Sequence, residues 1–241
     1  PRADGFFGSC DPKNPKNYRT RCSALLKSSF INILFDTSPD LRKQLLDNKI
    51  KKIHKVLYTH MHADQTHGIN DLRVFFIKNR NKVPIYADNR TRNYLAKSFS
   101  YCFKKHKNYP PTLSLFSIKK NFVFNKKIRI QSISVKHGSI NSISYLINKK
   151  LAYLPDVNKI YKKDYKYFKN LKYIIIDCLR YKEHPSHYNL NEVLNLNEIL
   201  KPKKMILTNL HSDLDYNKLL RKLPKNIKPA YDGLVLNLWS W

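Results

Sequence analysis

Glycine and cysteine are scarce in this 241-residue chain, which has only five glycines and four cysteines. There is no Gly/Ser-rich stretch, no low-complexity segment and no internal repeat, so nothing marks a flexible linker between domains. The cysteines are scattered without CxxC spacing, which excludes the dense disulfide framework of small secreted domains. We therefore expect a single domain over residues 1–241, with free thiols in a reducing cytoplasm at Cys10, Cys22, Cys102 and Cys178.

Long apolar runs are missing as well. No run approaches the roughly 20 residues that span a bilayer, and the chain does not open on a secretion signal. The 42% of hydrophobic residues is enough to fill a sizeable core. We expect a soluble, cytoplasmic protein without a membrane partner.

Negative charge is the third scarcity: 17 Asp and Glu stand against 46 Lys and Arg, for a net charge of +29. A charge of this size suggests a nucleic-acid partner through phosphate neutralisation. However, the basic residues form many short clusters, and Lys is accompanied by abundant Asn, Ile and Tyr, which are all encoded by A/T-rich codons. We favour compositional drift over an anionic small substrate or nucleic acid as the source of the charge.

Apolar, β-branched runs that end in turn signals predict strands within residues 28–40, 54–60, 82–88, 127–138, 142–156, 171–179, 203–209 and 231–239. Helical patterns lie within 38–48, 66–80, 89–103, 189–200 and 212–223. Strands alternate with helices at both ends of the chain, whereas the middle, from about 113 to 156, is strand after strand. This order predicts an α/β (α+β) fold with two mixed sheets packed face to face and helices outside.

The segment "YTHMHADQTHGINDLR" concentrates histidine after one of these strands. His60 and His62 are two residues apart at the end of a strand, a spacing that places both on one side. Asp64 continues that stride, and His67 can face the same way if a helix begins near Thr66. Imidazole and carboxylate groups suit Zn²⁺ and similar divalent ions, so this segment predicts a metal site.

Further candidate ligands follow other predicted strands: His137, Asp156 and His211. Two of the five glycines, Gly68 and Gly138, come directly after a candidate histidine. Glycine permits close backbone approaches that a side chain would block. Ligands from the ends of several strands are what a rigid metal site requires.

With these residues the sequence resembles the metallo-β-lactamase fold hydrolases, because "HMHADQ" stands where that family has HxHxDH. It is most similar to the PhnP-like branch of cyclic phosphodiesterases, through "DPKNPKNYRTRCSALL", "ILFDTSPDLRKQLL", "AYLPDV", "DCLRYKEHPSHYNLNEVL" and "LTNLHSDLDY". The resemblance implies a four-layer αββα sandwich that binds two divalent metal ions, Zn²⁺ or Mn²⁺. It implies that His60, His62 and His137 hold the first metal, that Asp64 and His211 hold the second, and that Asp156 bridges them.

Three departures from the family pattern affect these expectations. The chain opens at "PRADGFFGSC" without the usual first strand and Gly-rich turn, so an N-terminal piece is expected to be missing. Gln65 replaces a second-metal histidine, and its neutral amide is a weaker ligand, so the second site is expected to be weaker or to use His67. Cys10 and Cys22 are too few and too far apart for the additional structural zinc of some relatives.

The catalytic candidates, besides the metal ligand Asp64, are two histidines in "HPSHYNLNEVL". His187 lies five residues before Glu192, an arrangement similar to the catalytic histidine motif of tRNA 3′-processing endonucleases. We favour His187 as the general acid that protonates the leaving group, with His184 next and a substrate-orienting role as the alternative.

Two other charged residues have supporting roles in this interpretation. Asp36 is expected to support the ligands rather than to bind metal. Arg73 is a candidate substrate contact, although a structural ion pair is the more common role for such a residue.

The sequence thus predicts a metal-dependent hydrolase, with a small anionic phosphodiester, cyclic or nucleotide-like, as its substrate. A metal-bridging hydroxide would be the nucleophile. The alternatives are hydrolysis of a thioester or lactone, which the same metals can polarise, and an RNA-binding or RNA-processing protein. No basic motif interleaved with aromatic residues supports the RNA alternative. A homodimer is one assembly left open.

Overall fold

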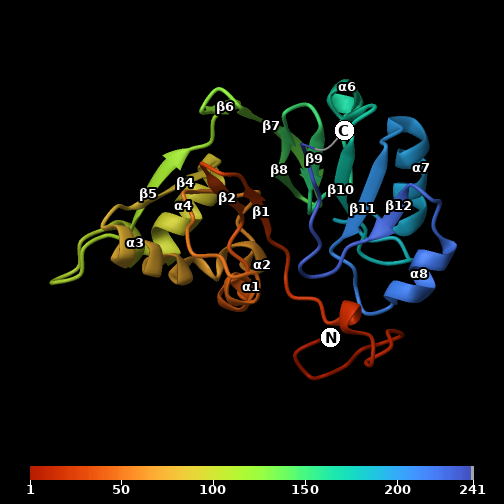
Figure 1. Cartoon of the computed structure of the whole chain (residues 1–241), viewed down its shortest axis with the longest axis horizontal. Helices are drawn as coiled ribbons and strands as arrows, with labels where there is room; N and C mark the ends of the chain where they lie inside the picture. The colour runs from red at the N-terminus through yellow and green to blue at the C-terminus, as the bar shows by residue number, and fades with distance from the viewer. Residues whose placement is uncertain (240–241) are drawn as a thin grey trace. The chain divides into compact units, whose positions relative to one another are not determined.

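The predicted strands assemble into two mixed sheets, one in each of two units of the chain (Figure 1). The computed structural model describes residues 1–239; unit 2 is Thr20–Lys119, and unit 1 is formed by Pro1–Arg19 with the described residues from Lys120 onward. No helix within residues 1–239 has the length and apolar character needed to cross a membrane. The extent of the domain over 1–241 stays a prediction.

The sheet of unit 2 has the order β1-β2-β3-β4-β5. Its strands are β1 (Ala24–Lys27), β2 (Asn32–Phe35), β3 (Lys55–Leu57), β4 (Val83–Ala87) and β5 (Leu113–Ser117). The connecting helices are α1 (Leu41–Asp47), α2 (Ala63–Thr66), the 3₁₀ helix η2 (Ile69–Leu72), α3 (Arg73–Asn79), α4 (Asn89–Ser98) and α5 (Ser100–Phe103). Strands β2 to β5 are parallel, so each needs a crossover connection, and these helices supply it.

Helices α1, α3 and α4 pack onto this sheet through single buried apolar positions. Leu41, Phe75 and Leu95 belong to the same apolar cluster as Val56 and Ile85 of the sheet. Strand β4 alternates buried and half-buried side chains, which is the period-two pattern of a strand with one face on the core. The core therefore fixes where β3 and β4 end, and the candidate ligands follow β3.

The sheet of unit 1 has the order β12-β11-β10-β9-β8-β7-β6. Its strands are β6 (Asn121–Phe124), β7 (Ile128–His137), β8 (Ile140–Ile147), β9 (Leu151–Leu154), β10 (Tyr173–Asp177), β11 (Lys204–Thr208) and β12 (Ile227–Pro229). The helices are η1 (Pro15–Asn17), η3 (Lys162–Asp164), α6 (Tyr165–Phe168), α7 (Leu190–Leu200) and α8 (Tyr216–Lys222). Strands β9 to β12 are parallel, and β6 to β9 are joined antiparallel.

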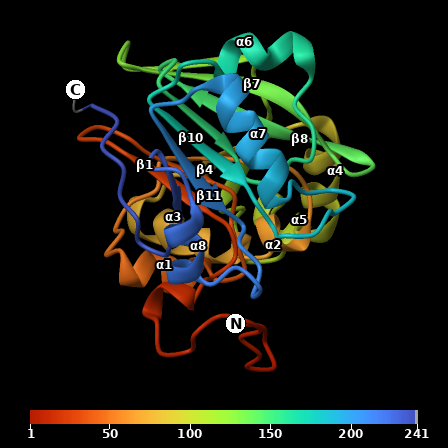
Figure 2. The ribbon, with the colours of Figure 1, turned by 90° about the vertical axis from the view of Figure 1, so that its right-hand side faces the viewer.

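Helix α7 lies over the face of β10 and β11 (Figure 2). It begins at a capping box, in which the Asn189 side chain accepts from the Glu192 backbone N–H and the Glu192 side chain accepts from the Asn189 backbone N–H. The buried face of α7 shares an apolar cluster with the sheet, through Val193, Leu196, Leu200, Ile174, Ile176, Met205 and Leu207. This cap ends the loop that carries His184 and His187, so the loop is anchored at its C-terminal end.

Strand direction brings several polar side chains to one edge of the unit 1 sheet. Strands β7 and β9 both run antiparallel to β8, so they point the same way as each other and as β10 and β11. The residues after these strands therefore gather at the carboxyl edge, which is where open α/β sheets bind ligands.

The predicted α/β fold class with two mixed sheets and helices is confirmed, and strands fill the middle of the chain as expected. The strand predicted over 231–239 is wrong, because the structure has no strand in that range. Gly233, with φ of 85°, and a turn closed by Leu234 N–H to Tyr231 O interrupt the run, and Val235 is 84% exposed. The last strand of the sheet, β12, precedes this segment, and it was not predicted.

Candidate active site

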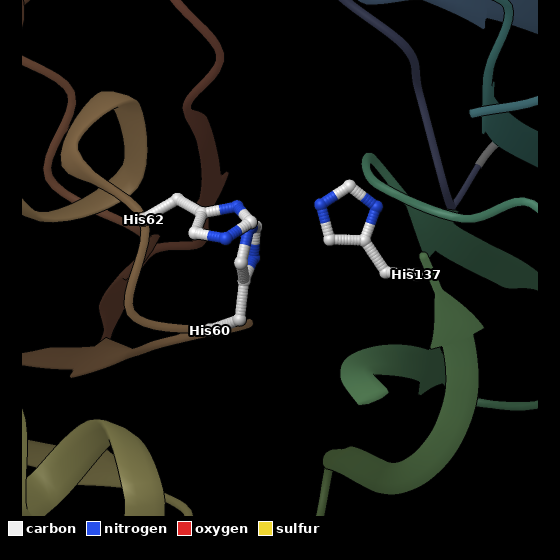
Figure 3. A group of neighbouring side chains, drawn as sticks. All are labelled: His60, His62 and His137. Atoms are coloured by element: carbon white, nitrogen blue, oxygen red, sulfur yellow. The ribbon is translucent and has the colours of Figure 1, made fainter. Parts of the chain in front are cut away.

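In unit 2, the loop between β3 and α2 brings His60 and His62 together. His60 Nε2 lies 2.8 Å from His62 Nδ1, and the two rings meet edge to face with centroids 4.5 Å apart (Figure 3). The predicted pairing of the HxH motif is therefore present in the structure. Metal–imidazole bonds of about 2.0–2.1 Å allow two nitrogens this close to bind one ion.

A buried hydrogen-bond chain sets the tautomer of His60. Asp36 accepts from the Thr59 backbone N–H at 2.7 Å and from Thr59 Oγ1 at 2.9 Å. Since the one hydroxyl proton of Thr59 goes to this carboxylate, Thr59 Oγ1 accepts from His60 Nδ1 at 3.0 Å. His60 therefore carries its proton on Nδ1 and presents the Nε2 lone pair, which is the orientation that ligand histidines adopt.

Asp36 makes these bonds from a left-handed backbone conformation, with φ of 60°, and its side chain is fully buried. Such a conformation costs a non-glycine residue about 1–2 kcal/mol. Strained residues of this kind persist where the surrounding hydrogen bonds determine them, and they cluster at functional sites. This geometry agrees with the supporting role predicted for Asp36.

Helix α2 carries the remaining candidates of this motif. It begins at Ala63 and ends at Thr66, so the condition set for His67, a helix that begins near Thr66, is not met. The Asp64 carboxylate accepts from Gln65 Nε2 at 3.3 Å. The His67 ring packs edge-on against Phe99, with centroids 5.5 Å apart, and its Nδ1 lies 3.1 Å from Thr66 Oγ1. The ligand roles of Asp64, Gln65 and His67 stay predictions.

Arg73, at the start of α3, lies with its guanidinium carbon 5.7 Å from the centre of the Tyr109 ring. This contact is a cation–π interaction rather than the structural ion pair weighed from the sequence. Its predicted contact with the substrate remains untested.

In unit 1, His137 ends β7 (Figure 3). The loop that precedes α7 orients its ring. Its Nδ1 donates to the backbone carbonyl of Ser186 at 2.7 Å, so the lone pair is on Nε2. Gly138 has φ of 58°, and a Cβ there would lie 2.8 Å from the Cβ of Ser186. Asn158 also joins the two segments, accepting from the Gly138 N–H and donating to Pro185 O. The glycine after His137 is thus required by close packing.

The carboxyl ends of β9, β10 and β11 supply a second network in unit 1. His187 Nδ1 donates to Asp177 Oδ2 at 2.6 Å, and this carboxylate also accepts from the Val157 backbone N–H at 3.0 Å. Asn209 Nδ2 lies 3.3 Å from Asp156 Oδ1 and 3.5 Å from Asp177 Oδ1, so its amide donates between two buried carboxylates. Asn209 holds this place from a left-handed conformation, with φ of 62°, which asparagine tolerates.

The other two predicted residues of unit 1, His184 and His211, are not part of the His137, Asp156 and His187 group. The His184 ring centroid is 5.0 Å from that of His187. Burial, together with the charges of His187 and Arg180, lowers the pKa of His184, and its Nδ1 accepts from the Ser186 N–H. The His211 side chain is 51% exposed and pairs with Asp213 at 3.2 Å.

Three side chains of unit 1 have the donor set of a divalent metal site. One ligand atom each of His137, Asp156 and His187 lies within 4.8 Å of the others. Two imidazoles and a carboxylate are the ligands that Zn²⁺ and neighbouring metals prefer. His137, Asp156 and the His60–His62 pair therefore fit the predicted metal chemistry, and His187, whose Nδ1 donates to Asp177, lies beside the unit 1 ligands.

Sequence reasoning missed Asp177, Asn209 and Thr59 as site residues. Asp177 is the last residue of β10 and Asn209 comes directly after β11, so both lie at the end of a strand, as Asp156 does, and this shared position was the available signal. Thr59 directly precedes the HxH motif, but nothing in its own sequence context indicates that it bonds to Asp36.

Comparisons with known proteins show the family to which the chain belongs. A family model described as a β-lactamase superfamily domain matches residues 31–209. The chain therefore belongs to the β-lactamase superfamily. Within this superfamily it has the metallo-β-lactamase fold and is PhnP-like, since it is 30% identical to a diphosphatase from the PhnP family, over 92% of this chain and 85% of that one, with a TM-score of 0.85.

Two curated relatives are longer than this chain. An octanoyltransferase of Porphyromonas gingivalis is 30% identical over 231 residues, which is 93% of this chain and 46% of that protein. Ribonuclease Z of Bacillus subtilis is 26% identical over 148 residues, which is 59% of this chain and 47% of that protein. The chain spans about half the length of the curated relatives that it matches. Together with the His and Asp cluster, the family indicates that the chain binds divalent metal.

Proposed function

We propose that this chain is a metal-dependent phosphodiesterase that acts on a small cyclic or nucleotide-like phosphodiester. The observation that carries the proposal is the Asp177–His187 pair at the carboxyl edge of the unit 1 sheet. A buried carboxylate bonded to one nitrogen of an imidazole leaves the other nitrogen for proton transfer, which is the arrangement of a general acid–base histidine.

Divalent metals would be held by His60, His62 and Asp64 of unit 2 and by His137, Asp156 and His211 of unit 1. Zn²⁺ and Mn²⁺ are the metals that these ligands favour. When bound, such metals lower the pKa of water towards about 7 and neutralise charge on a phosphoryl group. The tautomers of His60 and His137 support this role, because each carries its proton on Nδ1, bonded within its own unit, and its lone pair on Nε2.

The chain's own residues would then handle the leaving group. His187 Nε2 would donate a proton to the departing alkoxide oxygen, while Asp177 holds the Nδ1 proton and stabilises the charged imidazolium. Asn209 would keep Asp156 and Asp177 in place by donating to both carboxylates. His184 is the second candidate for the acid, since it lies beside His187.

The phosphodiester substrate is inferred from relatives whose names describe phosphate chemistry. The PhnP-family protein is a diphosphatase, and ribonuclease Z cleaves RNA, as its name states. A second candidate is hydrolysis of an acyl substrate such as a thioester or lactone, since the Porphyromonas gingivalis relative is an octanoyltransferase. Both substrate classes suit a metal that polarises an oxygen.

A substrate panel with one matched variant pair tests the proposal. Metal-loaded protein is assayed on bis(p-nitrophenyl) phosphate, a cyclic phosphodiester, a thioester and a lactone. We expect hydrolysis of the phosphodiesters, its loss in His62→Ala together with bound metal, and its retention in His106→Ala, which removes an exposed histidine. Turnover of only the acyl substrates would establish the second candidate instead, and activity that survives complete removal of metal would refute the mechanism.

A further inference from the structure

The guanidinium of Arg19 binds the loop that carries His211. Arg19 NH1 donates to the backbone carbonyls of Leu210 and His211, each at 3.3 Å, and NH2 donates to the carbonyl of Leu214 at 2.7 Å. Arg19 is thus bonded to three carbonyls within five consecutive residues of one loop. Each of these bonds is made to the backbone, so Arg19 determines the path of the loop rather than the rotamer of one side chain.

The segment that precedes Arg19 reinforces the same loop. Asn17 donates to Asp215 Oδ2 at 2.7 Å and accepts from the Tyr216 backbone N–H at 2.9 Å. Its carbonyl oxygen also accepts from Arg19 NH2 at 3.1 Å, so the amide and the guanidinium are held together. Asp215 in turn caps α8 by accepting from the Lys218 N–H. The loop is therefore fixed between Arg19 and the start of α8.

Close packing completes this contact. The Ser9 backbone N–H donates to Ser212 O at 2.9 Å, and a Cβ on Gly8 would lie 2.5 Å from that same oxygen. Gly8 has φ of 58°, which a side chain would also disfavour. The segment thus runs directly against the residue that follows His211.

The position of the His211 side chain depends on the backbone of its loop more than that of a buried ligand would. Its side chain is 51% exposed and pairs with Asp213, two residues further along the same loop. Its backbone N–H donates to Leu179 O at 2.8 Å. Because half of the side chain is exposed, the position of the His211 imidazole follows from the backbone that Arg19 holds.

We propose that Arg19 is a positioning residue for His211, which sets the affinity of the second metal site; this inference rests on the proposed function and its ligand assignment. Lysine cannot replace arginine in this role. A guanidinium offers five N–H donors in a rigid fork, whereas an ammonium is a compact charge that cannot reach three carbonyls in the same arrangement.

The test compares metal binding by the full chain with Arg19→Met, Arg19→Lys and His211→Ala, using titration with Mn²⁺ alone. Arg21→Met is the matched control, because Arg21 is exposed and pairs with Asp40 in unit 2. We expect Arg19→Met and Arg19→Lys to weaken the second equivalent of Mn²⁺ by about 10–100-fold, the usual cost of losing a residue that orients a ligand. The first equivalent and the control should be unchanged.

A double-mutant cycle separates positioning from a merely structural role. In the His211→Ala background, loss of Arg19 should weaken the second equivalent no further, because both changes act through the same imidazole. Additive effects, equal weakening of both equivalents, or unchanged binding in Arg19→Lys and Arg19→Met would overturn the proposal. Arg19→Lys keeps the charge, so it remains informative if Arg19→Met does not fold.

The outcome is also distinguishable from failure of the proposed function. Wild-type protein that binds two equivalents of Mn²⁺ but hydrolyses no phosphodiester would refute the proposed function and leave the role of Arg19 intact. Hydrolysis that persists while His211→Ala binds metal normally would refute the ligand role of His211, and with it the role of Arg19, but not the phosphodiesterase activity.

Discussion

Replacing Asp177 with asparagine tests whether a buried carboxylate supports the proposed general acid. In the structure, Asp177 Oδ2 accepts from both His187 Nδ1 and the Val157 N–H, and the side chain is fully buried. Asparagine can keep both bonds only with its carbonyl oxygen in the Oδ2 position. Its NH₂ group then faces the amide of Asn209, and the negative charge is lost.

The expected size of the effect follows from the change in hydrogen-bond type. A hydrogen bond to a charged group contributes about 1.5–3 kcal/mol and a neutral one about 0.5–1.5 kcal/mol, so the imidazolium of His187 loses about 1–2 kcal/mol of stabilisation. At about 1.4 kcal/mol for each tenfold change, turnover of an alkyl or cyclic phosphodiester should fall by about 5–30-fold. His187→Ala should cost more, about 10²–10⁴-fold, because the proton donor itself is removed.

The assay compares two leaving groups. The nitrophenolate of bis(p-nitrophenyl) phosphate departs without a proton, so both variants should lose less activity on this substrate than on the alkyl diester. Metal content is measured in parallel, and Asp164→Asn, at the end of η3, serves as a matched control in the same unit. Equal losses on both substrates, or loss of metal, would refute the assignment of His187 as the acid and move it to His184 or to metal-bound water.

Two further predictions concern packing and thiol reactivity. Gly138→Ala should lower both thermal stability and metal affinity, because the new Cβ would press on Ser186, whose carbonyl orients His137. Gly5→Ala is the control, since Gly5 also has a positive φ and a Cβ there would have no atom within 4 Å. An equal loss of metal affinity in both variants would contradict this reasoning. Burial raises the pKa of Cys102 to about 11, so its reactive thiolate is scarce at pH 8 and increases as the pH rises towards that value. Mass spectrometry after brief alkylation at pH 8 should find that Cys22, which is only partly buried, is modified before Cys102. The reverse order would show that burial does not control thiol reactivity here.

Local sequence patterns were sufficient to predict the fold class and the residues of the metal motif. Apolar, β-branched runs predicted β3, β7 and β9, and the polar residue at the end of each run pointed to His60, His137 and Asp156. These signals are local, because strand periodicity and the two-residue spacing of HxH involve only neighbours along the chain. The same reasoning failed over 231–239, where an apolar run has no strand partner.

The surroundings of these residues were decided only by the tertiary structure. The positions of Asp177 and Asn209 in the sequence do not reveal that they share a site. Their proximity follows from the parallel register that pairs Asp177 with Thr208, the residue before Asn209. The bond from Thr59 to Asp36 likewise depends on β2 and β3 lying side by side. Strand pairing is set by long-range packing of the core, which leaves no trace in the local sequence, so the residues that orient the ligands emerge only when the sheets are assembled.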